Sequence, residues 1–288
     1  MNLTVEHNGK IVDLKPLQFV NGLDIERQTP DAIRNIRHSK TLGLPELKGY
    51  AVTKGKCIIV GGAPSVAKFM PEIKRLAEEP ENAVFALNYM HNLLIANGVI
   101  PKGCVLFEID ADPTQILEKP HPLVNYFVCS LCHPATFEAL KGYSVTVWHA
   151  LAGLAKNMAV QEEYGPDAIM IGGGCQTFLR TVFLAYVLGF RKFEIFGCDS
   201  SFPNDGPSTH IDGYAVSTTP EKDGIDVWCG NNKTGEKRQF RTAGYLAEQA
   251  ENFRQQCQAT PDVARMMHVH GDSLLRYIHE TDFPECYQ

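Results

Sequence analysis

The chain has 288 residues, which is enough for one large α/β domain with extensions or for two small domains. Apolar residues make up 44% and charged residues 21%, which excludes a mainly disordered chain and a coiled coil. The net charge of −6 shows no basic excess, so we do not expect a nucleic acid as partner.

The amino-terminal residues carry no basic leader or apolar run, and no stretch reaches the roughly 18 apolar residues of a membrane span. We therefore expect a cytoplasmic protein with no membrane span. The nine cysteines are an odd number, and Cys57, Cys104 and Cys198 stand inside apolar runs, where a reduced thiol acts as a small hydrophobe. A disulfide scaffold is not expected, and the sequence leaves a homo-oligomer open.

Residues 1–50 alternate short apolar runs with Asn-Gly, Thr-Pro and Leu-Pro breaks. This pattern predicts an irregular or short-stranded N-terminal extension, with a helix that begins near Pro30 and Asp31. The remaining residues, 51–288, are predicted to form one domain.

From residue 56 onward, apolar runs of four to six residues alternate with helical stretches, the pattern of a parallel sheet covered on both faces. The predicted fold class is α/β: a Rossmann-like, mostly parallel sheet with helices on both faces. A helix over residues 176–188 is apolar nearly all round, which predicts burial against the sheet. The predicted strands are Cys57–Val60, Ala83–Leu87, Val105–Ile109, Tyr126–Cys129, Val145–Trp148, Ala168–Ile171 and Phe193–Phe196.

A glycine turn follows the first of these strands and leads into a predicted helix over residues 66–76. Glycine lets the backbone approach an anion closely, and a helix N-terminus offers free N–H groups at the positive end of its dipole. The turn therefore predicts a phosphate site at the carboxyl edge of the sheet, where open α/β folds bind ligands, with a tight structural bend as the alternative. Its residues are Gly61, Gly62, Ala63, Pro64 and Ser65.

A second glycine turn, Gly172, Gly173 and Gly174, follows the predicted strand 168–171 and opens the buried helix. Three residues without side chains would let a ligand lie on the backbone itself, and close packing of helix on strand is the alternative. Two such turns in one sheet favour a binding cleft.

Two strands end in carboxylates. Asp110 and Asp112 follow the predicted strand Val105–Ile109, and Asp199 follows the predicted strand Phe193–Phe196. Carboxylates at these ends could hold Mg²⁺ against a diphosphate or bind ribose hydroxyls, and Asp112 before Pro113 also fits a helix cap.

Residues 200–240 are rich in Pro, Gly, Asp, Asn and Thr and lack periodicity, which is typical of an active-site loop or lid. His210 in this loop is a candidate general base for a hydroxyl acceptor, because an imidazole titrates near neutrality; an exposed loop histidine is the alternative. The basic residues Lys233, Lys237, Arg238 and Arg241 could clamp a diphosphate or simply face solvent.

The last segments are predicted as a helix over 241–256, a strand over 265–269 and a helical turn over 272–279. His268 and His270 alternate along that strand and share a face, but no third metal ligand is apparent. We interpret them as structural and predict no metal site.

The order of motifs resembles the motility-associated-factor family of flagellin-modifying glycosyltransferases and its relatives of unknown function. It is also similar to bacterial sialyltransferases that use cytidine-monophosphate-linked sugars and to archaeal hydroxymethylpterin diphosphokinases. Residues 55–280 are covered. The resemblance rests on Gly61 to Ser65, Phe85 to Asn88, Asn97 to Pro101 leading into Glu108 to Asp110, Gly172 to Gly174, Leu188 to Phe190, Ile195 to Asp199 and Ser208 to His210.

This resemblance implies that Gly61 to Ser65 and Asn88 contact a nucleotide, that Gly172 to Gly174 border its phosphate and sugar, and that Ser273 lies near the phosphate. His210 matches the histidine of the flagellin-modifying pattern. The sialyltransferases keep a catalytic histidine before the C-terminal helix, and residues 235–241 contain none. Sialyl transfer with the usual base is therefore in doubt.

Three functions follow as hypotheses. The leading one is a transferase whose donor is a nucleotide-activated sugar of the CMP-sialic-acid type, in which Asn88 and Asp110 orient the nucleotide, with His210 and Asp199 as catalytic residues and no required cofactor. The second is a diphosphokinase that acts on a pterin-like alcohol and uses Mg²⁺. The third is a non-catalytic nucleotide-binding module of a mobile element or phage.

Overall fold

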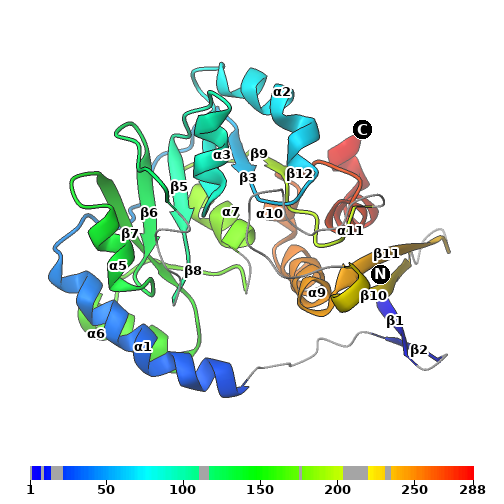
Figure 1. Ribbon diagram of the computed structural model, residues 1–288, viewed down its shortest axis with the longest axis horizontal. Helices are drawn as coiled ribbons and strands as arrows, with labels where there is room; N and C mark the ends of the chain where they lie inside the picture. The colour runs from blue at the N-terminus through cyan, green and yellow to red at the C-terminus, as the bar shows by residue number, and fades with distance from the viewer. Residues whose placement is uncertain are drawn as a thin grey trace. The chain divides into compact units, whose positions relative to one another are not determined.

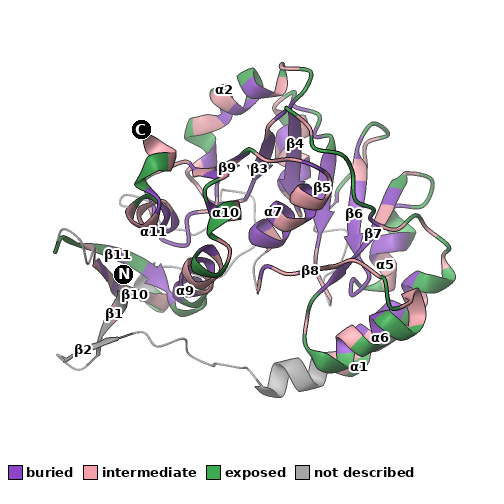
Figure 2. Cartoon of the chain, turned by 180° about the vertical axis from the view of Figure 1, so that it is seen from behind, coloured by how far each residue is buried: buried purple, intermediate pink, exposed green. Residues whose placement is uncertain are grey.

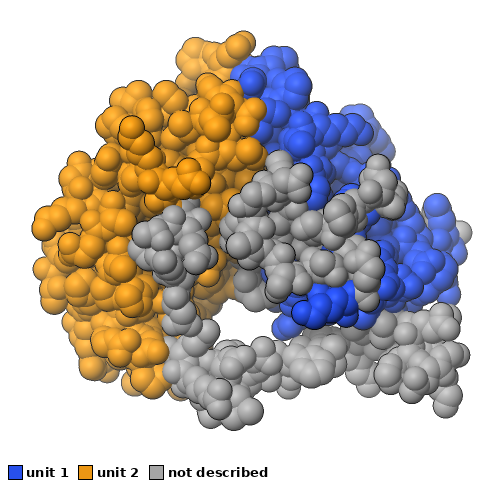
Figure 3. Space-filling model, in the orientation of Figure 1, with its two compact units in different colours: residues 1–18, 60–75, 192–288 blue, residues 19–59, 76–191 orange. Residues whose placement is uncertain are grey.

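A computed structural model describes residues 2–7, 10–13, 22–109, 117–174, 177–203, 220–230 and 235–288. The chain divides into two compact units (Figure 3). Unit 1 contains residues 1–18, 60–75 and 192–288, and unit 2 contains residues 19–59 and 76–191. Among the described residues, no helix is long and apolar enough to cross a membrane.

The main sheet confirms the predicted α/β fold class. It has eight strands in the order β12-β9-β3-β4-β5-β6-β7-β8, and the neighbouring pairs β12–β9, β4–β5, β5–β6, β6–β7 and β7–β8 are all parallel. The strands are β3 (Cys57–Val60), β4 (Ala83–Leu87), β5 (Gly103–Leu106), β6 (Asn125–Cys129), β7 (Ser144–Ala150), β8 (Met170–Ile171), β9 (Phe193–Phe196) and β12 (Met267–Val269).

Unit 2 contains a core built on the buried strands β4 to β7, which Figure 2 draws mostly in purple. Its largest fully buried side chains include Trp148 and Tyr126. Helix α1 packs against α6 and α5 (Figure 1), and α7 packs on β5 and β8. The helices of this unit are α1 (Gly22–Thr41), α3 (Met90–Ala96), α5 (Pro134–Ala139), α6 (Leu154–Tyr164) and α7 (Thr177–Val187).

Unit 1 contains β9, β12 and a second, antiparallel sheet in the order β11-β10-β1-β2. Helix α9 packs against β10, β11 and α11. The strands of the second sheet are β1 (Asn2–His7), β2 (Lys10–Asp13), β10 (Gly224–Gly230) and β11 (Lys237–Ala243). The helices are α2 (Val66–Ala77), which continues past the unit's boundary at Arg75, α8 (Pro220–Asp223), α9 (Gly244–Ala259), α10 (Pro261–Ala264), α11 (Leu274–Asp282) and the 3₁₀ turn η1 (Pro284–Tyr287).

Several predicted elements differ from the observed ones. Residues 200–240 include β10 and most of β11, because pairing with β1 and with each other orders a polar stretch that has little periodicity of its own. Helix α1 begins at Gly22 and contains Pro30, since a proline removes only one helical hydrogen bond and need not mark a helix start. The boundary predicted at residue 50 remains a prediction.

Candidate functional site

In unit 1, the turn after β3 packs against the turn after β9. The Gly61 N–H donates to the Phe196 carbonyl oxygen at 2.8 Å, and the Ala63 N–H donates to the Gly197 carbonyl oxygen at 2.9 Å. A Cβ on Gly61 would lie 2.5 Å from the Gly197 oxygen. Gly61 is therefore needed for close backbone approach, and neither of these two N–H groups is available to bind a phosphate.

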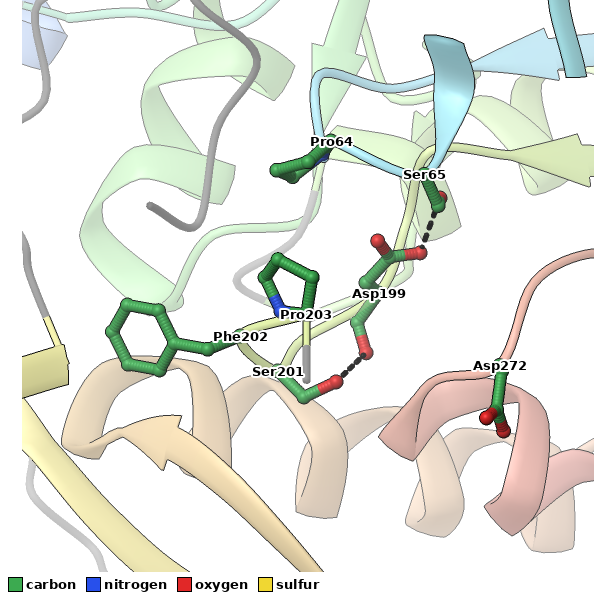
Figure 4. A pocket seen from close by; sticks show the side chains of 7 residues that line it. All are labelled: Pro64, Ser65, Asp199, Ser201, Phe202, Pro203 and Asp272. Carbon is green, nitrogen blue, oxygen red and sulfur yellow. Dashed lines mark hydrogen bonds between the residues drawn. The ribbon is translucent and has the colours of Figure 1, made fainter. Parts of the chain in front are cut away.

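The side chain of Asp199 lies at the N-terminus of α2. The Ser65 hydroxyl donates to Asp199 Oδ1 at 2.7 Å (Figure 4), and the Ser65 backbone N–H also bonds this carboxylate. The free N–H groups and dipole of a helix N-terminus attract a negative charge, and here the protein supplies that charge itself. The position predicted for a phosphate is thus occupied by the Asp199 carboxylate, which comes from the turn after β9.

Asp199 lines a pocket of about 340 Å³ in unit 1 (Figure 4). Most of its polar lining atoms are oxygens, from two carboxyl groups and two serine hydroxyls. Ser201 accepts a hydrogen bond from the Leu274 N–H at 3.2 Å. The lining residues are Pro64, Ser65, Asp199, Ser201, Phe202, Pro203 and Asp272.

Arg238 brings positive charge to the second carboxylate of the pocket. Its guanidinium donates to Asp272 Oδ1 at 2.6 Å and lies 4.8 Å from the centre of the Phe240 ring. Of the four basic residues near the end of the polar stretch, Arg238 is thus tied to the pocket, while Arg241 pairs with Asp226 at 3.2 Å.

The pKa of the Asp199 carboxyl determines whether this group can accept a proton in the pocket. Only 5% of the residue is exposed, and burial raises the pKa of its carboxyl to about 6, although the bonds from Ser65 oppose that rise. A carboxylate with a pKa near 6 is mostly ionised at neutral pH and is more basic than an exposed one. Asp199 can therefore accept a proton from a hydroxyl group bound in the pocket.

Ser273 caps the neighbouring helix. Its hydroxyl accepts the Arg276 N–H at 3.3 Å at the start of α11, and only 2% of the residue is exposed. The residue follows the pocket-lining Asp272, which agrees with a place near the site, but its hydroxyl is engaged in the cap.

In unit 2, Asn88 directly follows β4 and has a positive φ of 47°. Its amide donates to Glu108 Oε1 at 3.0 Å, and its side-chain oxygen accepts the Phe107 N–H at 3.4 Å. These bonds tie the ends of β4 and β5 together, a structural use that the sequence did not predict.

The second glycine turn packs against α7. Gly173 has a φ of 116°, and a Cβ there would lie 2.7 Å from the Arg180 backbone nitrogen. A Cβ on Gly172 would meet no atom of the described residues within 4 Å. Gly173 thus serves helix packing, whereas no described residue packs against Gly172 in this way.

Two buried cationic side chains lie in this part of unit 2. Arg180 is 4% exposed and donates to the carbonyl oxygens of Ile171 at 2.8 Å and Leu151 at 3.2 Å. Lys156 is 6% exposed, and burial, together with the charge of Arg180, lowers the pKa of its ammonium group. Among the described residues, no carboxylate pairs with Lys156. The Arg180 guanidinium, bonded to the Ile171 carbonyl oxygen, therefore places positive charge at the start of this glycine turn.

Asp110, Asp112 and His210 lie outside the described residues, so their predicted roles stay predictions. Sequence reasoning missed Ser201, Asp272, Lys156 and Arg180. The position of Asp272, three residues after the end of β12, was a usable signal for it. The burial of the two cations had no signal, because an isolated Lys or Arg on a helix is usually exposed.

A parallel sheet with a pocket where its strands end defines a Rossmann-like α/β protein. The fold is similar to that of a MAf glycosyltransferase from Magnetospirillum magneticum AMB-1, with a TM-score of 0.58 and 17% sequence identity. The match covers 86% of this chain but only 36% of that protein. This likeness concerns the fold alone.

The family model described as "6-hydroxymethylpterin diphosphokinase MptE-like" matches residues 31–205, more than half of the chain. The chain belongs to this MptE-like family. No curated protein matches the sequence. The resemblance found in the sequence is thus confirmed: the family model is MptE-like, and the fold is similar to that of a MAf glycosyltransferase.

Proposed function

We propose that this protein is a transferase that moves a group from a nucleotide donor to a hydroxyl acceptor held in the unit 1 pocket. Asp199 is the residue that accepts the hydroxyl proton. The observation that carries the proposal is the buried Asp199 carboxylate, whose pKa is raised to about 6 by burial, oriented by Ser65 inside a pocket. A general base is most effective when its pKa lies near the working pH.

We propose that the transferred group is a diphosphate, in keeping with the MptE-like family to which the chain belongs. The acceptor oxygen would attack the β-phosphorus of ATP, the bond to the α-phosphate oxygen would break, AMP would leave, and the acceptor proton would go to Asp199. The products are an alcohol diphosphate and AMP. The acceptor class is a pterin-like alcohol.

The pocket also fits Mg²⁺, because this ion prefers oxygen ligands and the pocket offers Asp272 and Ser201 in addition to the proposed base Asp199. When bound, Mg²⁺ would neutralise phosphate charge that the two carboxylates otherwise repel. Within unit 2, we propose Gly172 to Gly174 as a binding place for a nucleotide phosphate, with Arg180 beside the turn and Lys156 close enough to interact with the charge of Arg180.

The decisive experiment incubates the protein with ATP, Mg²⁺ and 6-hydroxymethylpterin and measures AMP. We expect AMP release that requires both Mg²⁺ and the alcohol. An assay with ATP but no alcohol controls for hydrolysis. AMP formation that ignores the alcohol, or no AMP with any alcohol tested, contradicts diphosphate transfer.

Glycosyl transfer is the second candidate, and the observation that favours it is the similarity of the fold to a MAf glycosyltransferase. A panel of nucleotide sugars, with CMP-sialic acid among them, tests it through release of the free nucleotide. Tight nucleotide binding without turnover in either assay would instead favour the non-catalytic module.

His210 remains a rival for the role of base. Activity should rise with pH through an apparent pKa of about 6 if Asp199 is the base. The His210→Ala variant should then keep this profile. If this dependence of activity on pH is lost in His210→Ala and retained in Asp199→Asn, the histidine is the base.

A further inference from the structure

A cluster of metal-ligating side chains lies in unit 1 on strands β9 and β12, outside the pocket. The strands are parallel neighbours, and their register places His268 opposite Glu194. His270 follows two residues after His268, so all three side chains stand on one face of the sheet. One ligand atom of each residue lies within 4.8 Å of those of the other two.

The hydrogen bonds of the cluster prepare a ligand nitrogen. His268 Nδ1 lies 2.9 Å from the Cys286 carbonyl oxygen. A carbonyl only accepts, so Nδ1 carries the proton in this bond and the lone pair stays on Nε2. Metal-binding histidines commonly donate their other N–H to a backbone carbonyl in this way.

The other two ligands are equally restrained. His270 Nε2 lies 2.8 Å from Glu194 Oε2, and their side chains are only 19% and 15% exposed. The His270 ring stacks on Phe196 with centroids 3.9 Å apart, and Phe69 contacts its edge. A metal ion would replace the proton between His270 and Glu194, and the ring would keep its orientation.

The charges around the cluster are compatible with a cation. The carboxylate of Glu72 interacts electrostatically with both His270 and Glu194. Arg276 interacts with His268, but its guanidinium is paired with Glu280 at 3.2 Å and stacks over Tyr287.

We propose that Glu194, His268 and His270 form a binding site for a divalent transition-metal ion such as Zn²⁺. Two imidazoles and one carboxylate are a donor set that Zn²⁺ and similar ions favour, and they leave a coordination position for water. The ion would fasten β9 to β12 just before these strands deliver Asp199 and Asp272 to the pocket. The proposal does not depend on the proposed transferase activity.

Titration calorimetry of the untagged, metal-free protein with Zn²⁺ tests the site. We expect one equivalent to bind, and Glu194→Gln and His270→Gln each to weaken binding at least tenfold. Glu194→Gln is close in shape to the original and keeps a hydrogen-bonding partner for His270, so it should fold. His121→Gln, a histidine outside the cluster, is the matched control and should bind as tightly as the unchanged protein.

Two further measurements do not depend on activity. Co²⁺ should give the visible spectrum of a nitrogen and oxygen site without a thiolate charge-transfer band, and Zn²⁺ should raise the melting temperature of the unchanged protein but not of Glu194→Gln. Cys286→Ser should leave both signals intact. No binding of Zn²⁺ or Co²⁺, equal affinity in the cluster variants, or loss of binding only in Cys286→Ser would overturn the proposal.

Discussion

The two glycine turns look alike in the sequence and differ in charge in the structure. The turn Gly61 to Ser65 in unit 1 is met by the carboxylate of Asp199, which binds the Ser65 hydroxyl and backbone N–H. The turn Gly172 to Gly174 in unit 2 follows Ile171, whose carbonyl oxygen accepts a hydrogen bond from the buried cation Arg180. The charge of Arg180 in turn lowers the pKa of the buried Lys156. In both turns one glycine is explained by backbone packing alone.

This contrast shows what a strand–glycine–helix pattern can predict. It predicts close backbone approach in both places. It does not predict the sign of the charge that gathers there, because that depends on side chains from other elements. We therefore expect the first turn to receive a hydroxyl or a metal-bound group, and the second a phosphate. The following four predictions test this difference.

The largest effect is expected for Asp199→Asn. The amide keeps the shape of the side chain and an oxygen that can accept from Ser65, but it cannot take up a proton. We expect the transfer rate to fall by about 10² to 10⁴-fold, measured as AMP or nucleotide release under saturating substrate. Nucleotide affinity, followed by calorimetry, should change little, and an unchanged rate would exclude Asp199 as the base.

Next in size are the packing glycines. Gly173→Ala should lower the free energy of unfolding by about 2 to 4 kcal/mol, because its Cβ would meet the Arg180 backbone and its φ is positive. Gly172→Ala is the matched control, because no atom of the described residues lies within 4 Å of its Cβ, and it should cost no more than about 0.5 kcal/mol. Urea unfolding measures both, and equal losses would contradict the packing role.

Gly172→Ala also separates packing from binding. If a phosphate lies on this turn, the added methyl group should weaken nucleotide binding while stability is kept. Unchanged affinity would leave the turn with a packing role only.

The third prediction concerns stability and pH. The folded-state pKa of Asp199 is raised from 3.8 to about 6, so its contribution to stability is full below pH 4 and is lost as the pH rises through 6. A shift of about 2 units corresponds to about 3 kcal/mol. Asp199→Asn should therefore gain stability relative to the unchanged protein as the pH rises from 4 to 7. Denaturation of both proteins at each pH measures the difference, and a constant difference would contradict the raised pKa.

The smallest effect is expected for Lys156→Met, which keeps most of the side-chain volume and removes the charge. Nucleotide affinity should fall about tenfold, or by about 1.4 kcal/mol, and more steeply at low salt. Calorimetry with ATP at two salt concentrations provides the measurement. Lys222→Met, which removes an exposed lysine of unit 1, is the control and should leave affinity unchanged.

The sequence predicted the strands of the main sheet best where apolar runs end at glycine or polar residues. Strands Cys57–Val60, Ala83–Leu87 and Phe193–Phe196 have the predicted bounds. Strands β10 and β11 were missed because their order comes from pairing with distant residues, which no local period reveals.

The site was predicted only in part, because the contacts that form it join residues that are distant in the sequence. Ser65 and Asp199 lie in the turns that follow β3 and β9, so their positions could be inferred. Their mutual hydrogen bond could not, because it joins residues 134 positions apart. Glu194 was missed as a partner of His268 because the register between β9 and β12 is not contained in either segment alone.

The contact between Gly61 and Gly197 makes these two positions depend on each other. A Cβ on Gly61 would meet the Gly197 oxygen, and a Cβ on Gly197 would meet the Gly61 oxygen. Either substitution forces the same two backbones apart, so the second should cost less once the first is present. A double-mutant cycle should therefore give a coupling energy between them, whereas substitutions at distant, independent sites add. Among natural variants, a residue other than glycine at one of these positions should therefore change which residues are accepted at the other.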